Sequence, residues 1–296
     1  MNASTTRSRM RSWLFAPGDS EKKMAKAADG PADIVLLDLE DSVAPERKPL
    51  AREMVRDFLA GRADRDRLWV RINPRASGEA LHDLEVVMSS APGGLLLPKA
   101  EGPEDVEALD TFLIRLEKAH GIPRGSTRVA ALVTETPKAM FRTGDYEGAP
   151  RLVAMSWGAE DLSSALGARV QFRPDGGYMP TYELARSLCL LGAAAAGVAA
   201  IETIQADFRD LEGLRERAMM VRSQGYRGML AIHPAQVDVI NEAFTPGEDE
   251  VAHARAVIAA FAANPGAGTV GLDGAMLDRP HLALAQALLA DAGVDA

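Results

Sequence analysis

The sequence is poor in cysteine and in positive charge, and each shortage excludes a class of protein. Its 296 residues include a single cysteine, Cys189, so no disulfide can form within the chain and a reducing, cytoplasmic location is expected. Lys and Arg number 33 against 42 Asp and Glu, a formal net charge of −9. This balance argues against a nucleic-acid partner, because phosphate contacts require a basic surface.

Long apolar runs are also absent. The longest, at 188–201, is rich in alanine and shorter than the roughly 20 residues that a membrane helix needs. The N-terminal segment 1–11 carries three arginines, but no apolar stretch typical of a signal peptide follows it. We therefore expect a protein that neither enters a membrane nor carries a signal peptide.

Short apolar runs are frequent, by contrast, and turn residues bound each of them. They lie at 13–16, 34–38, 68–71, 94–97, 129–134, 152–155, 199–201 and 228–232. Runs of this kind are typical of parallel strands buried on both faces, and the segments between them have helical spacing. Eight such strand–helix units in about 250 residues predict an α/β fold, a (β/α)₈ TIM barrel. The alternative, an open doubly wound sheet, is disfavoured because no glycine-rich dinucleotide loop follows the first run.

Two of the predicted helices have clear features. In the segment 45–60, Leu50, Met54 and Phe58 repeat every four residues, which predicts that these side chains form the buried face. The segment 103–120 begins with a proline and is followed by a glycine, as helices often are. Both helices are expected to pack on the outside of the barrel.

The alternating pattern ends after the eighth run, where a proline, a glycine and several acidic residues follow. We therefore predict a catalytic barrel domain of residues 1–245 and a C-terminal extension or lid of residues 246–296. The extension is predicted to be helical at 251–263 and 281–292, with the glycine-rich segment 264–274 between these helices.

Polar residues follow every predicted strand, and a barrel brings these strand ends to one face, where the active sites of such barrels lie. That face is expected to hold several carboxylates, one arginine and several lysines, among them Asp38, Glu40, Asp41, Arg71, Lys99, Glu135, Asp161 and Glu202. Clustered carboxylates repel one another unless a cation or a proton lies between them. An oxygen-rich site without paired His or Cys indicates Mg²⁺ or a similar hard ion.

Seven short motifs, in order along almost the whole chain, are similar to those of the citrate lyase beta-subunit and malyl-CoA lyase family of the HpcH/HpaI aldolase superfamily. They are Leu-Phe-Ala-Pro-Gly at 14–18, Leu-Asp-Leu-Glu-Asp-Ser-Val at 37–43, Val-Arg-Ile-Asn-Pro at 70–74, Leu-Pro-Lys at 97–99, Thr-Glu-Thr at 134–136, Trp-Gly-Ala-Glu-Asp-Leu at 157–162 and Ala-Ile-His-Pro at 231–234. Together the motifs are specific for the family and much less specific for the substrate within it.

The resemblance implies that Glu135 and Asp161 are the direct protein ligands of a Mg²⁺ cofactor. It also implies a set of acidic residues that orient metal-bound waters, namely Asp38, Glu40 and Asp41. The alternative to metal binding at 135–136 and 161 is a structural role, in which Thr136 or Asp161 caps the helix that follows it. The alternative for the acidic set is a solvated loop.

The resemblance further implies that Arg71 binds substrate and stabilises enolate or alkoxide charge during catalysis. The alternative is a salt bridge between Arg71 and a neighbouring acid such as Glu40. Residues assigned to the side of the site that binds acyl-CoA and the small acid are Phe15, Lys22, Lys26, Ile232 and His233. For the two lysines the alternative is a solvated helix face.

In stand-alone members of this family, an aspartate of the C-terminal extension reaches the neighbouring subunit's site within a Gly-x-Met-(Ile/Leu)-Asp motif. Residues 274–278 of this chain read Gly-Ala-Met-Leu-Asp and match that motif, so the resemblance nominates Asp278 as the catalytic base. It also implies a homo-oligomer, a trimer or a hexamer. The alternative is an aspartate that caps a loop or helix before Pro280.

The implied activity is that of a carbon–carbon lyase that cleaves or forms a 3-hydroxyacyl-CoA from acetyl-CoA and a small 2-oxo acid. Malyl-, citramalyl- and citryl-CoA are the candidate compounds. Three other functions stay open: a beta subunit of a multi-chain citrate lyase, a CoA-independent pyruvate aldolase, and a non-catalytic CoA-ester-binding protein. The aldolase is disfavoured because those enzymes carry a histidine base where this chain has Asp41.

Overall fold

The structure is a computed structural model that describes residues 9–294. Residues 1–8, which make up most of the N-terminal segment considered for a signal peptide, lie outside the described residues, as do 295–296. The chain divides into two compact units, one of residues 10–241 and one of residue 9 with residues 242–294. Among the described helices, none is both long and apolar enough to cross a membrane.

The first unit is a closed barrel of parallel strands, which confirms the predicted fold. The strands are β1 (Ser12–Pro17), β2 (Ile34–Asp38), β3 (Leu68–Arg71), β4 (Gly94–Leu97), β5 (Arg128–Leu132), β6 (Leu152–Ser156), β7 (Ala199–Glu202) and β8 (Gly228–Ala231). Each strand pairs with the next along the chain, and β8 pairs with β1. All eight coincide with predicted runs, because a strand buried on both faces leaves a continuous apolar signal.

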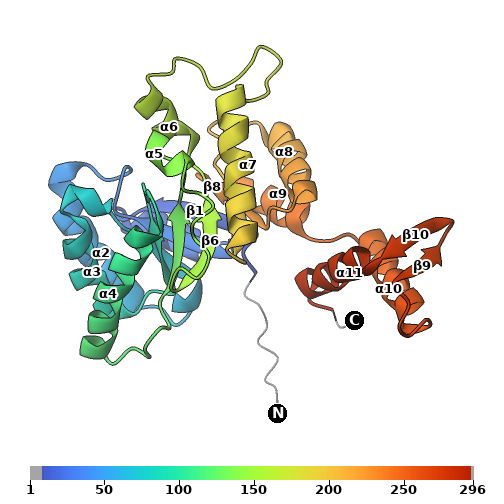
Figure 1. Ribbon diagram of the computed structural model, residues 1–296. Coiled ribbons are helices and arrows are strands. Elements are labelled where there is room, and N and C mark those ends of the chain that lie inside the picture. Colours follow the sequence, from blue (N-terminus) through green and yellow to red (C-terminus); the bar gives the residue numbers. More distant parts are fainter. Residues whose placement is uncertain (1–8, 295–296) are drawn as a thin grey trace. The chain divides into compact units, whose positions relative to one another are not determined.

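Helices enclose the strands on the outside of this unit (Figure 1). They are α1 (Glu21–Ala28), α2 (Lys48–Ala60), α3 (Ala80–Val87), α4 (Pro103–His120), α5 (Pro137–Met140), α6 (Ala159–Leu166), α7 (Pro180–Ala195), α8 (Leu211–Gln224) and α9 (Ala235–Phe244), the last of which crosses into the second unit. Helix α4 has the predicted bounds. It ends at Gly121, whose φ of 68° is a left-handed conformation that glycine adopts without strain.

Helix α2 buries a different face from the predicted one. The predicted stripe begins at Leu50, which is 49% exposed, whereas the buried stripe is Ala51, Val55 and Leu59. Both stripes repeat every four residues, so helical spacing alone does not distinguish them. The tertiary structure decides between them, because the buried Arg52 guanidinium on this side of α2 pairs with a carboxylate of α3.

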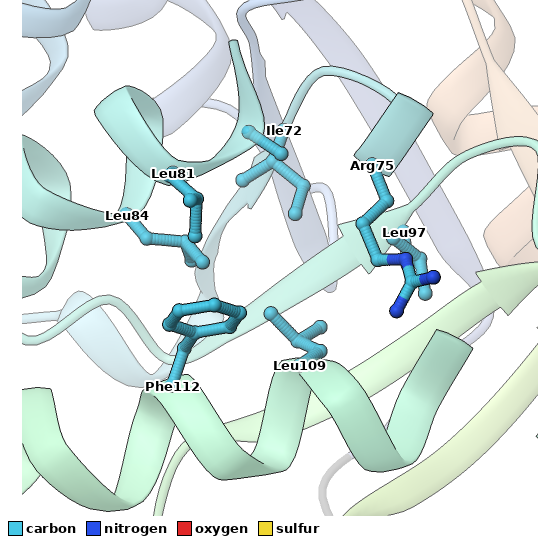
Figure 2. Close-up of a pocket in the computed structure, with 8 residues that line it drawn as sticks. Ile72, Arg75, Leu81, Leu84, Leu97, Leu109 and Phe112 are labelled. Atoms are coloured by element: carbon cyan, nitrogen blue, oxygen red, sulfur yellow. The ribbon is translucent and has the colours of Figure 1, made fainter. Parts of the chain in front are cut away.

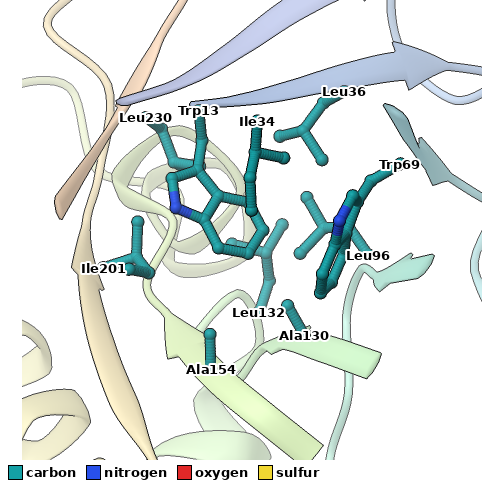
Figure 3. Close-up of a cluster of buried hydrophobic side chains, with 10 residues drawn as sticks. All are labelled: Trp13, Ile34, Leu36, Trp69, Leu96, Ala130, Leu132, Ala154, Ile201 and Leu230. Carbon is teal, nitrogen blue, oxygen red and sulfur yellow. The ribbon is translucent and has the colours of Figure 1, made fainter. Parts of the chain in front are cut away.

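The interior of the barrel is filled by side chains from all eight strands (Figure 3). Trp13 and Trp69 meet edge to face, with ring centroids 5.0 Å apart, and small residues such as Ala130 and Ala154 lie in the same cluster. Gly94 is needed here, because a Cβ at this position would lie 2.5 Å from the Trp69 ring. The interior is therefore a packed core and not a channel, so ligands can be bound only at the ends of the strands.

The second unit contains a hairpin that the sequence analysis did not predict. Its elements are α10 (Glu248–Ala262), β9 (Thr269–Leu272), β10 (Ala275–Asp278) and α11 (Arg279–Ala292). Strands β9 and β10 pair antiparallel through Asp273 and Gly274, both of which have positive φ. An Asp-Gly pair in this conformation is typical of a tight hairpin turn. Part of the glycine-rich segment between the two predicted helices is therefore a strand.

Candidate active site

Arg71 and Asp38 form an ion pair at the carboxyl ends of two neighbouring strands. The register of β2 and β3 sets the two residues side by side. Arg71 Nε and Nη2 each donate to one oxygen of Asp38 at 2.7 Å, and Nη1 lies 2.9 Å from Glu40 Oε2. The guanidinium also lies over the Phe15 ring, 4.6 Å from its centroid. The salt bridge to Glu40 that sequence analysis offered as an alternative role for Arg71 is present.

The pKa values of the Asp38 and Glu40 carboxyl groups are shifted in opposite directions. Burial alone would raise the pKa of Asp38, but Arg71 and the backbone N–H groups of Glu40 and Ser42 lower it below its usual value. Burial raises the pKa of Glu40, and Arg71 and Lys99 offset the shift only in part. Glu40 Oε2 accepts no hydrogen bond. Asp38 is thus a fixed anchor for Arg71, and Glu40 keeps an acceptor available.

Lys99, which the sequence placed on this polar face without a specific role, links the acidic groups. Its ammonium lies 2.7 Å from Glu40 Oε1, 3.0 Å from Asp161 Oδ1 and 3.8 Å from Asp41 Oδ2. Lys99 has a φ of 51°, which is unfavourable for a residue with a Cβ and concentrates at functional sites. The sequence signals for this residue were its position shortly after β4 and the Leu-Pro-Lys motif at 97–99.

Glu135 is the most buried of the predicted metal ligands, with 4% of its surface exposed. The backbone N–H of Lys99 donates to Oε2 at 2.6 Å. The other oxygen faces Gly158, where a Cβ would lie 2.7 Å from Oε1. Burial, Asp161 and Glu40 raise the pKa of Glu135 to about 8. A cation beside Glu135 would therefore be needed to keep its carboxyl group ionised at neutral pH.

Asp161 lies in the first turn of α6, and its side chain pairs with Lys99 and does not cap the helix. Gly158 occupies the N-cap position. At the neighbouring α5, Thr136 is the N-cap residue, and its Oγ1 accepts a hydrogen bond from the backbone N–H of Ala139 at 3.2 Å. Asp161 is thus free of a capping role and available to a ligand.

The charges of this cluster fit a divalent cation. The cluster contains four carboxylates and two cationic side chains, so its net charge is −2 when all six are ionised. The carboxylates are those of Asp38, Glu40, Glu135 and Asp161, and the cations are Arg71 and Lys99. Among residues 9–294, no group of three His, Cys, Asp or Glu side chains is arranged as a complete metal site. Mg²⁺ does not require one, because it is commonly held by one or two carboxylates and keeps several waters.

The other predicted site residues of the barrel unit lie at the ends of β1 and β8. Lys22 and Lys26 are exposed on α1, which begins shortly after β1. Ile232 is exposed directly after β8, and the neighbouring His233 ring stacks on Phe208 with centroids 4.5 Å apart. Phe208 lies in the segment after β7 and was not predicted, since nothing in its local sequence marks it.

Asp278 belongs to the second unit, where it precedes α11. It occupies the N-cap position of that helix, and its Oδ1 lies 2.5 Å from His281 Nδ1. The side chain is 45% exposed, and the hydrogen bond with His281 lowers the pKa of its carboxyl group. The position that sequence analysis offered as an alternative, a helix-cap aspartate before Pro280, is therefore present.

A small apolar cavity between α3 and α4 is not a candidate for the site (Figure 2). It is lined mainly by leucines, with Ile72, Arg75 and Phe112, and its volume is about 20 Å³. That space holds about one water molecule. Neither a small oxo acid nor a thioester fits there, so the polar strand ends remain the site of interest.

Comparisons with known proteins agree with this geometry. The HpcH/HpaI aldolase/citrate lyase family matches residues 11–234, a range that contains the whole charge cluster. A citrate lyase subunit beta-like protein of Mycobacterium tuberculosis is 37% identical over 281 residues, 95% of each chain. A (3S)-malyl-CoA thioesterase of Cereibacter sphaeroides is 33% identical over 286 residues, 95% of this chain and 94% of its own.

One solved structure is similar to this chain in both fold and sequence. It is the protein CitE from Mycobacterium tuberculosis in complex with magnesium, acetoacetate and coenzyme A, with a TM-score of 0.80 and 36% identity. The alignment covers 96% of this chain and 98% of that chain. These matches confirm the resemblance predicted from the motifs, and the chain belongs to the HpcH/HpaI aldolase/citrate lyase family.

Proposed function

We propose that this protein is a Mg²⁺-dependent carbon–carbon lyase that cleaves or forms a 3-hydroxyacyl-CoA from acetyl-CoA and a small 2-oxo acid. The observation that carries the proposal is the cluster in which Lys99 bridges Glu40 and Asp161 while its backbone N–H holds Glu135. The excess negative charge there suits Mg²⁺. The related CitE was solved with magnesium, acetoacetate and coenzyme A, which supports the same ligand classes.

Glu135 and Asp161 would hold the metal ion, and Arg71 would bind the substrate. When bound, Mg²⁺ supplies a Lewis acid for oxygens of the small acid. A guanidinium has five N–H groups, and Asp38 accepts hydrogen bonds from two of those of Arg71. Glu40 lies close to Nη1 as an ion-pair partner, so N–H groups on both terminal nitrogens are left for a carboxylate or thioester oxygen. Because Asp38 holds this arginine in place, its charge is oriented before enolate or alkoxide charge develops.

The acyl-CoA would lie toward the ends of β1 and β8. Lys22 and Lys26 project from one face of α1 and supply local positive charge to an acidic protein. Phe15, Ile232 and His233 would line the same side through packing. This local positive charge favours an acyl-CoA substrate over the substrates of a CoA-independent aldolase.

Asp278 would act as the base that takes a proton from the acetyl-CoA methyl group. It lies in the second unit, is half exposed and is not part of the carboxylate cluster, so a bound cation would not hold it in place. In a homo-oligomer, a trimer or hexamer, the extension of one chain could complete the site of another. In that arrangement the Asp278 carboxylate would leave its partner His281 and face the substrate.

A second candidate, hydrolysis of the thioester, is favoured by the relative named (3S)-malyl-CoA thioesterase. The test is to incubate the purified protein and Mg²⁺ with acetyl-CoA or propionyl-CoA and with glyoxylate, pyruvate or oxaloacetate. A new acyl-CoA without free CoA indicates condensation, and free CoA with the hydroxy acid indicates hydrolysis. Conversion without any CoA ester would indicate an aldolase, and activity only on an acyl carrier protein would indicate a citrate lyase subunit. No conversion with any substrate would leave a CoA-ester-binding protein and overturn the proposal.

A further inference from the structure

A buried polar network joins the carboxyl ends of β6 and β7 behind the candidate metal ligands. Trp157, directly after β6, donates its indole N–H to Glu202 Oε2 at 3.0 Å, and Arg217 Nη2 of α8 donates to Oε1 at 2.6 Å. Trp157 and Glu202 are fully buried, and the Arg217 side chain is 13% exposed. Because Glu202 has no contact with solvent, it cannot bind substrate directly.

The loop between α6 and α7 arches away from the helices in Figure 1, and its end returns to contact this network. Tyr178 of the loop packs edge to face on Trp157, with centroids 5.2 Å apart, and Arg217 lies 5.0 Å from the Tyr178 centroid. From the same loop, Gln171 Nε2 donates to Glu160 Oε2 at 2.8 Å. Glu160 directly precedes Asp161, so the loop also reaches the start of α6.

Gly158, the residue after Trp157, links this network to both candidate metal ligands, Glu135 and Asp161. The backbone N–H of Gly158 lies 3.3 Å from Thr134 Oγ1 at the end of β5, and a Cβ on Gly158 would strike Glu135. Helix α6, which carries Asp161, begins at the next residue. A shift of Trp157 would therefore move Gly158 and the start of α6. That movement would displace Asp161 and, at the same time, disturb the packing of Glu135.

Stability alone does not account for this network. A buried ion pair is often no more stabilising than a well-packed apolar group, and Arg217 Nε is buried here without a hydrogen-bond partner. We propose that Glu202, held by Arg217, is a positioning residue that fixes Trp157 and thereby sets the spacing of Glu135 and Asp161 for a divalent cation. This inference rests on the proposed function, because it concerns the same metal ligands.

The barrel offers a matched control at its opposite end. Arg151, just before β6, pairs with Glu117 near the end of α4, with Nη2 2.9 Å from Oε2 and side chains 5% and 0% exposed. This second buried Arg–Glu pair has comparable chemistry and burial but no contact with the strand ends that carry the site. Glu117→Gln should therefore report the effect of losing such a pair on stability alone.

The test measures binding of Mn²⁺, used as a spectroscopic probe for Mg²⁺, to the wild-type full chain and to three variants. Glu202→Gln and Trp157→Phe should each raise the Kd for Mn²⁺ about tenfold or more, the usual scale for residues that orient metal ligands. Glu117→Gln should leave the Kd unchanged. Trp157→Phe keeps an aromatic ring against Tyr178 and removes the N–H, so it carries the test if Glu202→Gln does not fold.

Two results would overturn the inference. Wild-type Kd values in folded Glu202→Gln and Trp157→Phe would show that the network does not position the ligands, and an equal loss in Glu117→Gln would show a general effect of stability. If the wild-type protein binds no Mn²⁺, or binds it equally well after Glu135→Gln, the proposed metal site itself is wrong. Failure of the inference and failure of the proposed function are therefore distinguishable.

Discussion

The Lys99 ammonium lies 3.0 Å from Asp161 Oδ1, so a positively charged side chain contacts one of the proposed metal ligands. Removing this charge should strengthen binding of a divalent cation, because like charges at close range repel. We expect Lys99→Gly to bind Mn²⁺ about tenfold more tightly, the equivalent of about 1.4 kcal/mol, and to turn over more slowly.

Glycine is the suitable replacement because the backbone φ of residue 99 is 51°. Lys99→Ala removes the same charge and should be less stable than Lys99→Gly by about 1 kcal/mol, since alanine is strained in this conformation. Titration with Mn²⁺ and chemical denaturation measure the two effects separately. Weaker Mn²⁺ binding by Lys99→Gly would mean that the ammonium mainly holds the ligands in place.

Removal of either proposed ligand should eliminate both metal binding and turnover. Glu135→Gln and Asp161→Asn keep the shape of each side chain and remove its charge, so the fold should survive while activity falls by at least about 100-fold. EDTA should abolish wild-type activity, and Mg²⁺ should restore it. Asp145→Asn, an exposed acid paired with Arg142, is the control and should behave as wild type. Turnover that persists in EDTA contradicts the metal site.

The lysines of α1 should affect CoA esters more than oxo acids. Replacing Lys22 and Lys26 by glutamine should raise the KM for acyl-CoA several-fold with little change for the small acid. Added salt should weaken binding of CoA by the wild type more than by the double variant, because salt screens exposed charges. Lys118→Gln on α4 removes an exposed lysine elsewhere and serves as the control. Equal CoA affinity in all three proteins would assign Lys22 and Lys26 to the solvated surface.

Asp278→Asn should lower kcat by at least about 100-fold and leave Mn²⁺ and CoA-ester binding nearly unchanged, as expected for loss of a general base. Mixing these chains with Glu135→Gln chains should restore part of the activity if the base acts across subunits. Asp273→Asn is a suitable control, because asparagine also tolerates the positive φ of this turn residue. Normal turnover by Asp278→Asn excludes the proton-transfer role, and inactive mixtures that demonstrably exchange subunits exclude its action in trans.

The Glu117–Arg151 pair predicts a specific acid response. Burial would raise the pKa of Glu117, but Arg151 and the backbone N–H groups of Gly125 and Thr127 outweigh it and lower the pKa to about 2. A carboxyl whose pKa is lowered on folding stabilises the protein above its unfolded pKa, and this stabilisation is lost as the pH falls toward the folded pKa. Its full value here is about 3 kcal/mol.

Glu117→Gln should therefore lower the free energy of unfolding by about 3 kcal/mol at pH 7. The difference from wild type should shrink between about pH 5 and pH 2, because the wild type loses the contribution of Glu117 over that range. Urea unfolding at a series of pH values measures both curves. A difference that stays constant with pH would show that the lost stability does not come from ionised Glu117.

The barrel and the composition of its polar face could be predicted from the amino-acid sequence alone. Eight apolar runs and their turn residues are local signals, and a parallel strand buried on both faces must be apolar whatever surrounds it. The motifs at the strand ends identified Arg71, Glu135 and Asp161 as residues of one face, since closing the barrel brings all strand ends together. These inferences need only periodicity and topology.

The tertiary structure decided which of these groups meet. Glu40 and Lys99 are 59 residues apart in the sequence, and only the pairing of β2 with β3 and of β3 with β4 brings their side chains to 2.7 Å. The same holds for Trp157 and Glu202, whose local sequences give no sign of a shared hydrogen bond. The buried face of α2 likewise depends on a partner in α3. Long-range charge pairs such as these have no sequence period, so they become visible only when the barrel closes.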